Sequence, residues 1–220
     1  MSTTRQTFDR DLQELQDAIL NLGELVQQAI ADAVKSLAKQ DAGLAQKVMI
    51  RDDDIDQLAL GIEDKCMKLI ATQQPMAKDL RKISMGFRII VDLERMGDHA
   101  FNIAKIAAKL TEENLIKPLV DIPKMAELAQ QMVKKVLRSY VDGDTQAAQE
   151  VGKADDKIDA LYKSVFDELL AIMQADPTTL VQATNLLFVC RFIERIADHA
   201  TNIAEGVVYL ETGVRKDLNL

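Results

Sequence analysis

Apolar residues recur at every third or fourth position through most of the chain, which is the period of an amphipathic α-helix. The two clearest stripes are Ile55, Leu58, Ile62, Cys66 and Leu69, and Ile158, Leu161, Val165, Leu169 and Ile172. Each stripe predicts one helix face turned toward a core. No apolar run reaches the roughly 18 residues that a membrane-spanning helix needs, so the pattern favours helices that pack on one another.

Helix-breaking residues interrupt this pattern at matching places in the two halves of the chain. In the first half Asp41 can cap a second helix, and residues 73–75 (QQP) can end it and open a third. In the second half, residues 142–144 (DGD) and 175–177 (ADP) stand at the corresponding places. Three helices per half are therefore expected.

The third helix of each half is expected to be long. These helices are predicted at 76–109 and 178–211, and each would span about 50 Å. Between the halves, residues 110–123 contain two prolines and are typical of a linker. Long helices with short connections pack as antiparallel bundles, so two three-helix bundles side by side are expected.

An eleven-residue phrase occurs twice, 100 residues apart. Residues 94–104 read ERMGDHAFNIA and residues 194–204 read ERIADHATNIA, with eight identical positions. Residues 41–56 and 144–159 also share eight of sixteen positions. A repeat of this length indicates internal duplication, so we predict an all-α protein of two tandem, structurally similar three-helix bundles. The two expected domains are residues 1–112 and 113–220.

Composition narrows the class of protein. The chain has 220 residues, 48% of them hydrophobic and 28% charged, which suffices for an ample core. Its net charge of −8 argues against nucleic-acid binding, which usually needs a basic face. Cys66 and Cys190 lack metal-ligand spacing and are expected to be buried free thiols. The chain begins without the apolar segment of a signal peptide, so a cytoplasmic location is expected.

Carboxylates four residues apart recur on the predicted helices. Glu94, Asp98 and Asn102 are spaced i, i+4 and i+8, which places them on one helix face within about 80° of arc. The other candidates of the same kind are Glu194, Asp198 and Asn202, Asp52 with Asp56, and Asp155 with Asp159. Like charges at this spacing repel unless a cation neutralises them. Each half is therefore expected to present two carboxylate pairs that converge on a metal ion, and solvated acidic faces are the alternative.

Oxygen ligands suit a hard or borderline cation such as Mg²⁺, Mn²⁺, Ca²⁺ or oxidised iron better than a thiolate-type zinc site. His99 and His199 point about 100° away from the aspartates before them, so hydrogen bonds at the edge of the core are favoured over ligation. Arg95 and Arg195 are expected in intrahelical salt bridges, with a phosphate-binding role as the alternative.

Motifs of catalysis are absent from the sequence. It has no glycine-rich phosphate loop, no nucleophile with an adjacent base and no dinucleotide fingerprint. A protein that is not an enzyme is therefore expected. A carboxylate-bridged metalloenzyme or metal store, and a helical scaffold without metal, remain as alternatives.

The duplicated ERxxD phrase, the DxxID phrase of the preceding helix and residues 74–81 (QPMAKDLR) together resemble the PhoU family of bacterial phosphate-uptake regulators. The resemblance covers nearly the whole chain and implies two similar three-helix bundles. It places the family's E(D)xxxD motifs on the four acidic pairs, and in relatives these acids hold multinuclear iron clusters or other metals. Iron is thus implied at these positions, with zinc, manganese and magnesium as alternatives and no organic cofactor.

The chain differs from the common sequence motifs of the family at two places. Ala197 stands where glycine is frequent, which should not disturb the carboxylate face. The Asp79–Arg81 triplet (DLR) has TLV as its counterpart at 179–181. If the triplet binds a partner, only the first half can supply it.

The resemblance also implies a function. Members of the family are cytoplasmic regulators that link the phosphate ABC transporter to a sensor histidine kinase and hold the phosphate-starvation response off when phosphate is plentiful. The implied partners are a PstB-type transporter ATPase and a PhoR-type kinase, with attachment to the membrane through them, and a homodimer. Whether the kinase, the transporter or both are regulated is left open by the sequence.

Overall fold

Six α-helices and one short 3₁₀ turn make up most of the computed structural model, which describes residues 3–218, with side chains from residue 6 onward. The helices are α1 (Thr3–Lys39), α2 (Ala42–Gln73), α3 (Ala77–Leu110), α4 (Asp121–Asp142), α5 (Thr145–Ala175) and α6 (Leu180–Thr212). No strand occurs between residues 3 and 218, so the predicted all-α class is confirmed. The outermost residues of the two expected domains, 1–2 and 219–220, lie outside the described residues.

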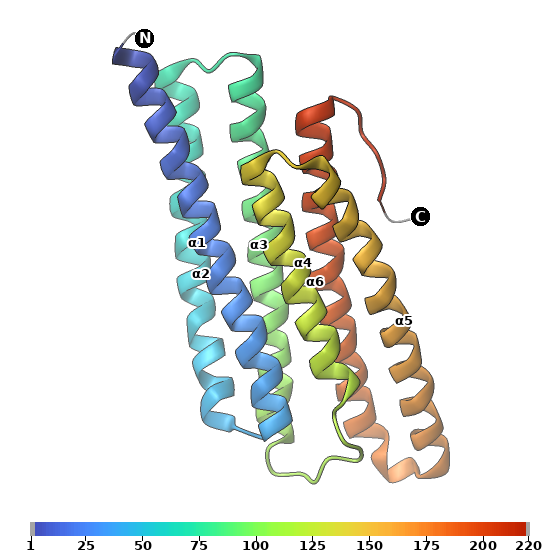
Figure 1. The fold of residues 1–220 in the computed structure, drawn as a ribbon. Coiled ribbons are helices and arrows are strands. Elements are labelled where there is room, and N and C mark those ends of the chain that lie inside the picture. The colour runs from blue at the N-terminus through green and yellow to red at the C-terminus, as the bar shows by residue number, and fades with distance from the viewer. Residues whose placement is uncertain (1–2, 219–220) are drawn as a thin grey trace.

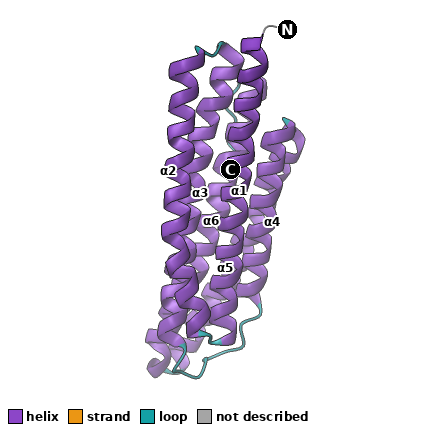
Figure 2. Cartoon of the chain, turned by 90° about the vertical axis from the view of Figure 1, so that its left-hand side faces the viewer, coloured by secondary structure: helices purple, strands orange, loops and turns teal. Residues whose placement is uncertain are grey.

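The helices run side by side along one long axis (Figures 1 and 2). In the first half α3 packs against α1 and α2, and in the second half α6 packs against α4 and α5. The halves meet where α3 lies against α6 and where α1 lies against α4. The two central helices, α3 and α6, run in opposite directions (Figure 1). Within the described residues, no helix is both long and apolar enough to cross a membrane.

The core is continuous through both halves. Of the predicted stripes, Ile55 and Ile62 in α2 and Ile158 and Val165 in α5 are buried, so these helices turn the expected faces inward. Cys66 and Cys190 are also buried, and both are free thiols, as predicted.

Helix starts follow from side-chain caps. The Asp41 carboxylate accepts a hydrogen bond from the Leu44 backbone N–H at 2.9 Å, and Asp144 does the same for Ala147 at 2.9 Å. Each cap satisfies an amide of the first turn that has no intrahelical acceptor. The predicted Asp41 cap is thereby confirmed, and Asp144 is the capping residue within the predicted 142–144 break.

Two predicted boundaries were wrong by a few residues. The third helix of the second half begins at Leu180, because Pro177–Thr179 forms a 3₁₀ turn in which the Asp176 carboxylate accepts from the Thr178 N–H at 3.0 Å. The linker ends before Asp121, so Pro123 lies in the first turn of α4. A proline fits there because the amides of a first turn have no helical acceptor.

Alanine substitutions at two glycines in helix interiors are expected to change the free energy of unfolding differently. At Gly61 an added Cβ would meet nothing within 4 Å, so Gly61→Ala is expected to raise the free energy of unfolding by about 0.5–1 kcal/mol. At Gly97 a Cβ would lie 3.1 Å from Ile55 Cγ2, so the same change there forces a core side chain to move.

Urea unfolding followed by circular dichroism measures both changes. Gly97→Ala is the matched control and should gain less stability than Gly61→Ala, or lose some. Equal gains at the two positions would show that contact with Ile55 does not limit the packing of α2 on α3.

Candidate functional site

The first acidic face joins Asp52 and Asp56 on α2 with Glu94 and Asp98 on α3. Burial, followed by the charges of Asp56 and Asp98, raises the pKa of Asp52 to about 6. Burial and the charge of Asp98 also raise the pKa of Asp56 and that of Glu94. The four carboxylates are thus electrostatic neighbours, as their spacing on two adjacent helices predicts.

The second acidic face joins Asp155 and Asp159 on α5 with Glu194 and Asp198 on α6. It lies deeper, since Asp155 is 2% exposed and Glu194 is 8% exposed. Burial and the charge of Asp198, partly offset by the Arg191 guanidinium, raise the pKa of Glu194 to about 7. Burial and the same aspartate raise the pKa of Asp159. The duplication therefore reproduces the acidic face with stronger burial.

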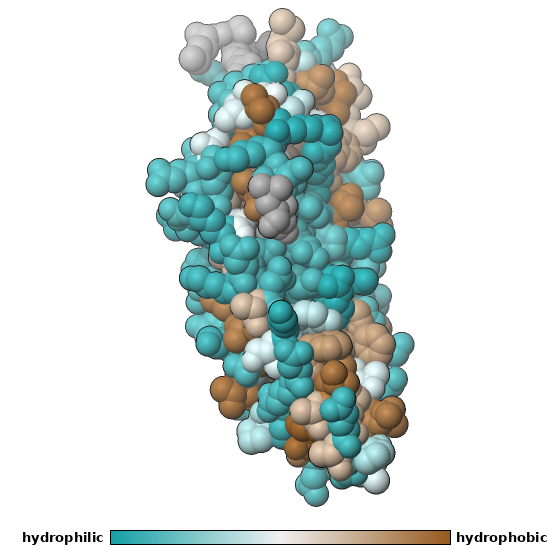
Figure 3. All heavy atoms as spheres, turned by 90° about the vertical axis from the view of Figure 1, so that its right-hand side faces the viewer, coloured by the Kyte–Doolittle hydropathy of each residue, from teal (hydrophilic) through white to brown (hydrophobic). Residues whose placement is uncertain are grey.

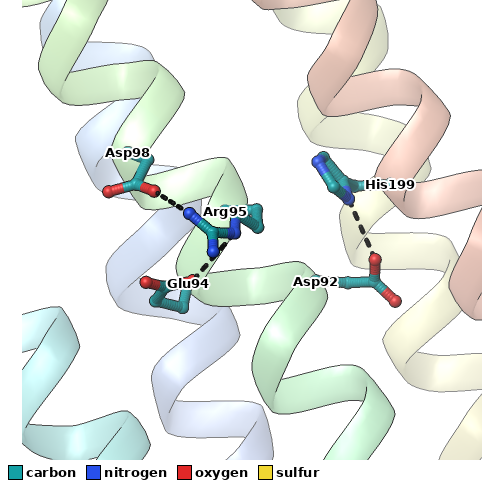
Figure 4. Close-up of polar contacts among 5 residues, drawn as sticks. All are labelled: Asp92, Glu94, Arg95, Asp98 and His199. Carbon is teal, nitrogen blue, oxygen red and sulfur yellow. Dashed lines mark hydrogen bonds and ion pairs between the residues drawn. The ribbon is translucent and has the colours of Figure 1, made fainter.

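Arginines contact the two faces in different ways. On the first face Arg95 lies 3.5 Å from Glu94 and 3.0 Å from Asp98, which confirms the predicted intrahelical salt bridge (Figure 4). Its counterpart Arg195 forms no ion pair with a described carboxylate, so that part of the prediction was wrong. Arg191, one turn earlier, donates to Glu194 Oε1 instead. Sequence reasoning missed Arg191 because the duplicated phrase starts after it.

One oxygen of the second face has no protein partner. Glu194 Oε2 is buried and accepts no hydrogen bond from any described residue. A buried carboxylate oxygen without a donor is costly, and a cation is one way to satisfy it. The donor types of both faces therefore fit a metal ion.

The side chains are not already arranged around an ion. Among the described residues, no three His, Cys, Asp or Glu side chains stand together in a geometry that would hold one. Binding would need the carboxylates of a face to turn toward one another. The metal-ligand role therefore stays a prediction.

Asn102 and Asn202 lie at the seam between the halves. Both line a hollow of about 510 Å³ between α3 and α6, together with Asp98 and Asp198. Asn102 Nδ2 donates to the backbone carbonyl of Asp98 at 2.8 Å, and Oδ1, the amide atom that would ligate a cation, takes no part in this bond. A ligand role for the two asparagines likewise stays a prediction.

The two histidines meet at the same seam. Their rings lie 5.6 Å apart, and His99 stacks on Phe192 with a centroid separation of 5.6 Å. His199 Nδ1 forms a hydrogen bond with Asp92 Oδ1 at 2.9 Å (Figure 4), which agrees with the role predicted for it. Burial and the neighbouring His199 lower the pKa of His99 to about 4, and its Nδ1 has no partner among the described residues. No pattern in the sequence points to Asp92 as the partner of His199, because Asp92 lies in the other half of the chain.

The duplication also appears in the comparison with protein families. The family model for the PhoU domain matches residues 19–107 and again residues 122–207. The chain belongs to the PhoU family. Two PhoU-domain matches in tandem and six helices confirm the predicted pair of similar three-helix bundles.

Similarity to individual PhoU proteins extends over nearly the full length. A phosphate-specific transport system accessory protein PhoU homologue from Clostridium acetobutylicum is 42% identical over 98% of this chain and 99% of its own. Its counterpart from Aquifex aeolicus is 43% identical, over 93% of this chain and 92% of its own.

Solved PhoU structures share the fold. The crystal structure of PhoU from Pseudomonas aeruginosa matches with a TM-score of 0.90 at 36% identity, covering 94% of this chain and 100% of that one. The phosphate transport system regulatory protein PhoU from Streptococcus pneumoniae matches with a TM-score of 0.89 at 32% identity, covering 96% and 99%. The arrangement of both bundles is therefore common to family members.

Proposed function

We propose that the protein is a non-enzymatic regulator of phosphate uptake that holds the phosphate-starvation response off while phosphate is plentiful. The observation that carries the proposal is similarity at 42% identity, end to end, to a phosphate-specific transport system accessory protein. A fragmentary match would support only a shared fold, whereas both halves and their junction match here.

The regulator acts by binding to other proteins. Its partners are a PstB-type transporter ATPase and a PhoR-type sensor histidine kinase, which bring it to the membrane from the cytoplasm, and it forms a homodimer. Exposed apolar side chains support this role, since such patches mark interaction sites. They include Phe166 and Leu170 in the C-terminal half of α5 and Leu180, Val181 and Phe188 in the N-terminal half of α6, on either side of the connection between the two helices. Figure 3 shows apolar side chains gathered toward the lower end of this face of the molecule.

The two acidic faces bind metal cations that stabilise these docking surfaces. Iron is the first candidate, with zinc, manganese and magnesium as alternatives. The ligands come from Asp52, Asp56, Glu94, Asp98 and Asn102 in the first half, and from Asp155, Asp159, Glu194, Asp198 and Asn202 in the second. Support comes from the crowding of like charges on each face and from the buried Glu194 Oε2. A bound cation supplies charge neutralisation and cross-links two helices of a bundle.

Deleting the gene is expected to derepress a phosphate-starvation reporter in high phosphate, and the wild-type gene should restore repression. Val181→Glu places a charge in the apolar patch at a position that is 68% exposed, so it should leave the fold intact and fail to restore repression. The measurement is reporter activity in cells grown at high and at low phosphate.

Leu60→Glu is the matched control, because Leu60 is also an exposed apolar side chain, at 57%, but lies on α2 away from the patch. It should restore repression fully. Co-purification from the same cells identifies which partners the patch binds. An unchanged reporter after deletion would contradict the assignment.

A further inference from the structure

A groove runs between the N-terminal half of α3 and the C-terminal half of α6, and its smaller part has basic walls. It consists of two adjoining hollows of about 550 Å³ and about 260 Å³, which share Arg88, Gly206, Tyr209 and Arg215. α6 ends at Thr212, and the tail that follows it forms part of the groove wall. Arg215 belongs to this tail. The smaller hollow contains no residue of either acidic face, and the larger hollow shares only Asn202 with the proposed metal ligands.

The smaller hollow is lined by three arginines and no carboxylate among the described residues. Its polar lining consists of Arg81, Ser84, Arg88, Tyr209 and Arg215. The Arg215 guanidinium lies over the Tyr209 ring, 5.6 Å from its centroid, which holds the tail arginine toward the hollow.

These three arginines lack ionic partners within the described part of the chain. No described carboxylate lies within ion-pair distance of Arg81, Arg88 or Arg215, although the chain carries a net charge of −8. Arginines gathered around a concavity repel one another unless an anion neutralises them. Cationic side chains are therefore crowded here, whereas carboxylates are crowded on the acidic faces.

The adjoining larger hollow is lined by acidic as well as basic side chains. Asp92 is bonded to His199 at 2.9 Å, and Glu205 Oε1 accepts from the Leu218 N–H at 2.9 Å. The tail adds Lys216 and Asp217, whose charges cancel. The walls of this hollow also include Phe87 and Val91, so it combines apolar and polar surface.

The second half does not repeat the basic positions. One hundred residues after Arg81 and Arg88 stand Val181 and Phe188, which are 68% and 52% exposed. Duplication copied the acidic phrase into both halves, so the arginines are not a by-product of the repeat. Arg81 and Arg88 therefore have no basic counterparts at the matching positions of the second half.

We propose that this groove binds a small phosphate-bearing anion, with the phosphate group in the smaller hollow between Arg81, Arg88 and Arg215. Guanidinium groups match phosphate oxygens in paired hydrogen bonds, and the Ser84 and Tyr209 hydroxyls supply further donors. The larger hollow accommodates the remainder of a phosphate ester. The site goes beyond the proposed regulatory role and requires neither metal nor partner.

Isothermal titration calorimetry of the full chain tests the site, with chelator present and ionic strength fixed. Separate arms use orthophosphate and adenosine monophosphate. We expect saturable binding at one site, and Arg88→Gln or Arg81→Gln should weaken it by about tenfold or more, since each removes a charge-assisted contact. Equal affinity in the two arms identifies the free phosphate ion as the ligand, and tighter binding of the nucleotide identifies an ester.

Arg138→Gln is the matched control, since Arg138 lies on α4 outside the groove with a side chain that is 81% exposed. It should bind as the wild type does. Arg88→Lys keeps the charge and should recover part of the affinity. The proposal is overturned if neither anion gives saturable binding, or if Arg138→Gln weakens binding as much as Arg88→Gln does. Circular dichroism of every variant excludes unfolding as the cause.

Discussion

Mn²⁺ added to metal-free protein is expected to raise the free energy of unfolding by about 2–3 kcal/mol for each acidic face when the ion is at about 100 times its Kd. The cause is the crowding of carboxylates, which raises the pKa of Asp52 to about 6 and that of Glu194 to about 7 when no cation is present. A cation that binds only the folded state removes this repulsion. Thermal unfolding by circular dichroism, with and without the ion, measures the gain.

Replacing one aspartate of each face shows where the ion binds. Asp98→Asn should remove the gain of the first face, Asp198→Asn that of the second, and the double variant both. Asp167→Asn, at an exposed position of α5 outside the faces, is the matched control and should respond as the wild type does. If Mn²⁺ stabilises the double variant as much as the wild type, these faces are not where it acts.

The metal-free protein is expected to lose stability as the pH rises from about 4.5 to about 7. Glu194 and Asp52 have raised folded pKa values, so their contribution is full below the unfolded pKa values of 4.5 and 3.8 and is lost as the pH rises through about 7 and about 6. The folded pKa of His99 is lowered to about 4, so His99 acts in the opposite direction between about 4 and 6.5 and offsets one of the two carboxylates.

The net fall should amount to about 1–2 kcal/mol between about pH 4.5 and about pH 7, less than the full shifts would give at 1.36 kcal/mol per pH unit, because neighbouring carboxylates titrate together. Urea unfolding across the pH range measures this fall.

Single substitutions separate the two opposing contributions. Glu194→Gln should stabilise the protein at about pH 8 by removing the buried negative charge, while its amide oxygen still accepts from Arg191. His99→Phe should make the fall in stability with pH steeper, because it removes the histidine that opposes it. Glu112→Gln, at an exposed position of the linker, should change neither contribution. A curve that rises steadily toward alkaline pH would contradict the raised carboxylate pKa values.

Local signals in the sequence located most helix ends. Asp41 and the segment 142–144 could be predicted as cap positions because a cap needs only a side chain within three residues of the amide it satisfies, and the structure shows that Asp144 is the capping residue of that segment. The same reasoning placed the start of α6 too early, since Pro177 and the Asp176 side chain form a 3₁₀ turn before the helix begins. It also excluded Pro123 from α4, although a first turn accepts proline.

The acidic pairs could be predicted from the sequence because residues four apart share a helix face whatever the helix packs against. The duplication could be predicted because both copies stand in the printed chain. Contacts between side chains of the two halves could not be predicted from the sequence. Asp92 meets His199, and Arg88 faces Arg215, only because α3 and α6 pack in opposite directions with the tail beside them.

The sequence alone determined the helices, the repeat and the two acidic phrases, because each depends on contacts within a few residues or on identity between copies. Tertiary structure decided the unequal burial of the two faces, the meeting of the histidines and the basic groove. Those features depend on which helix faces meet across more than 100 residues of chain, and the shared core sets that packing.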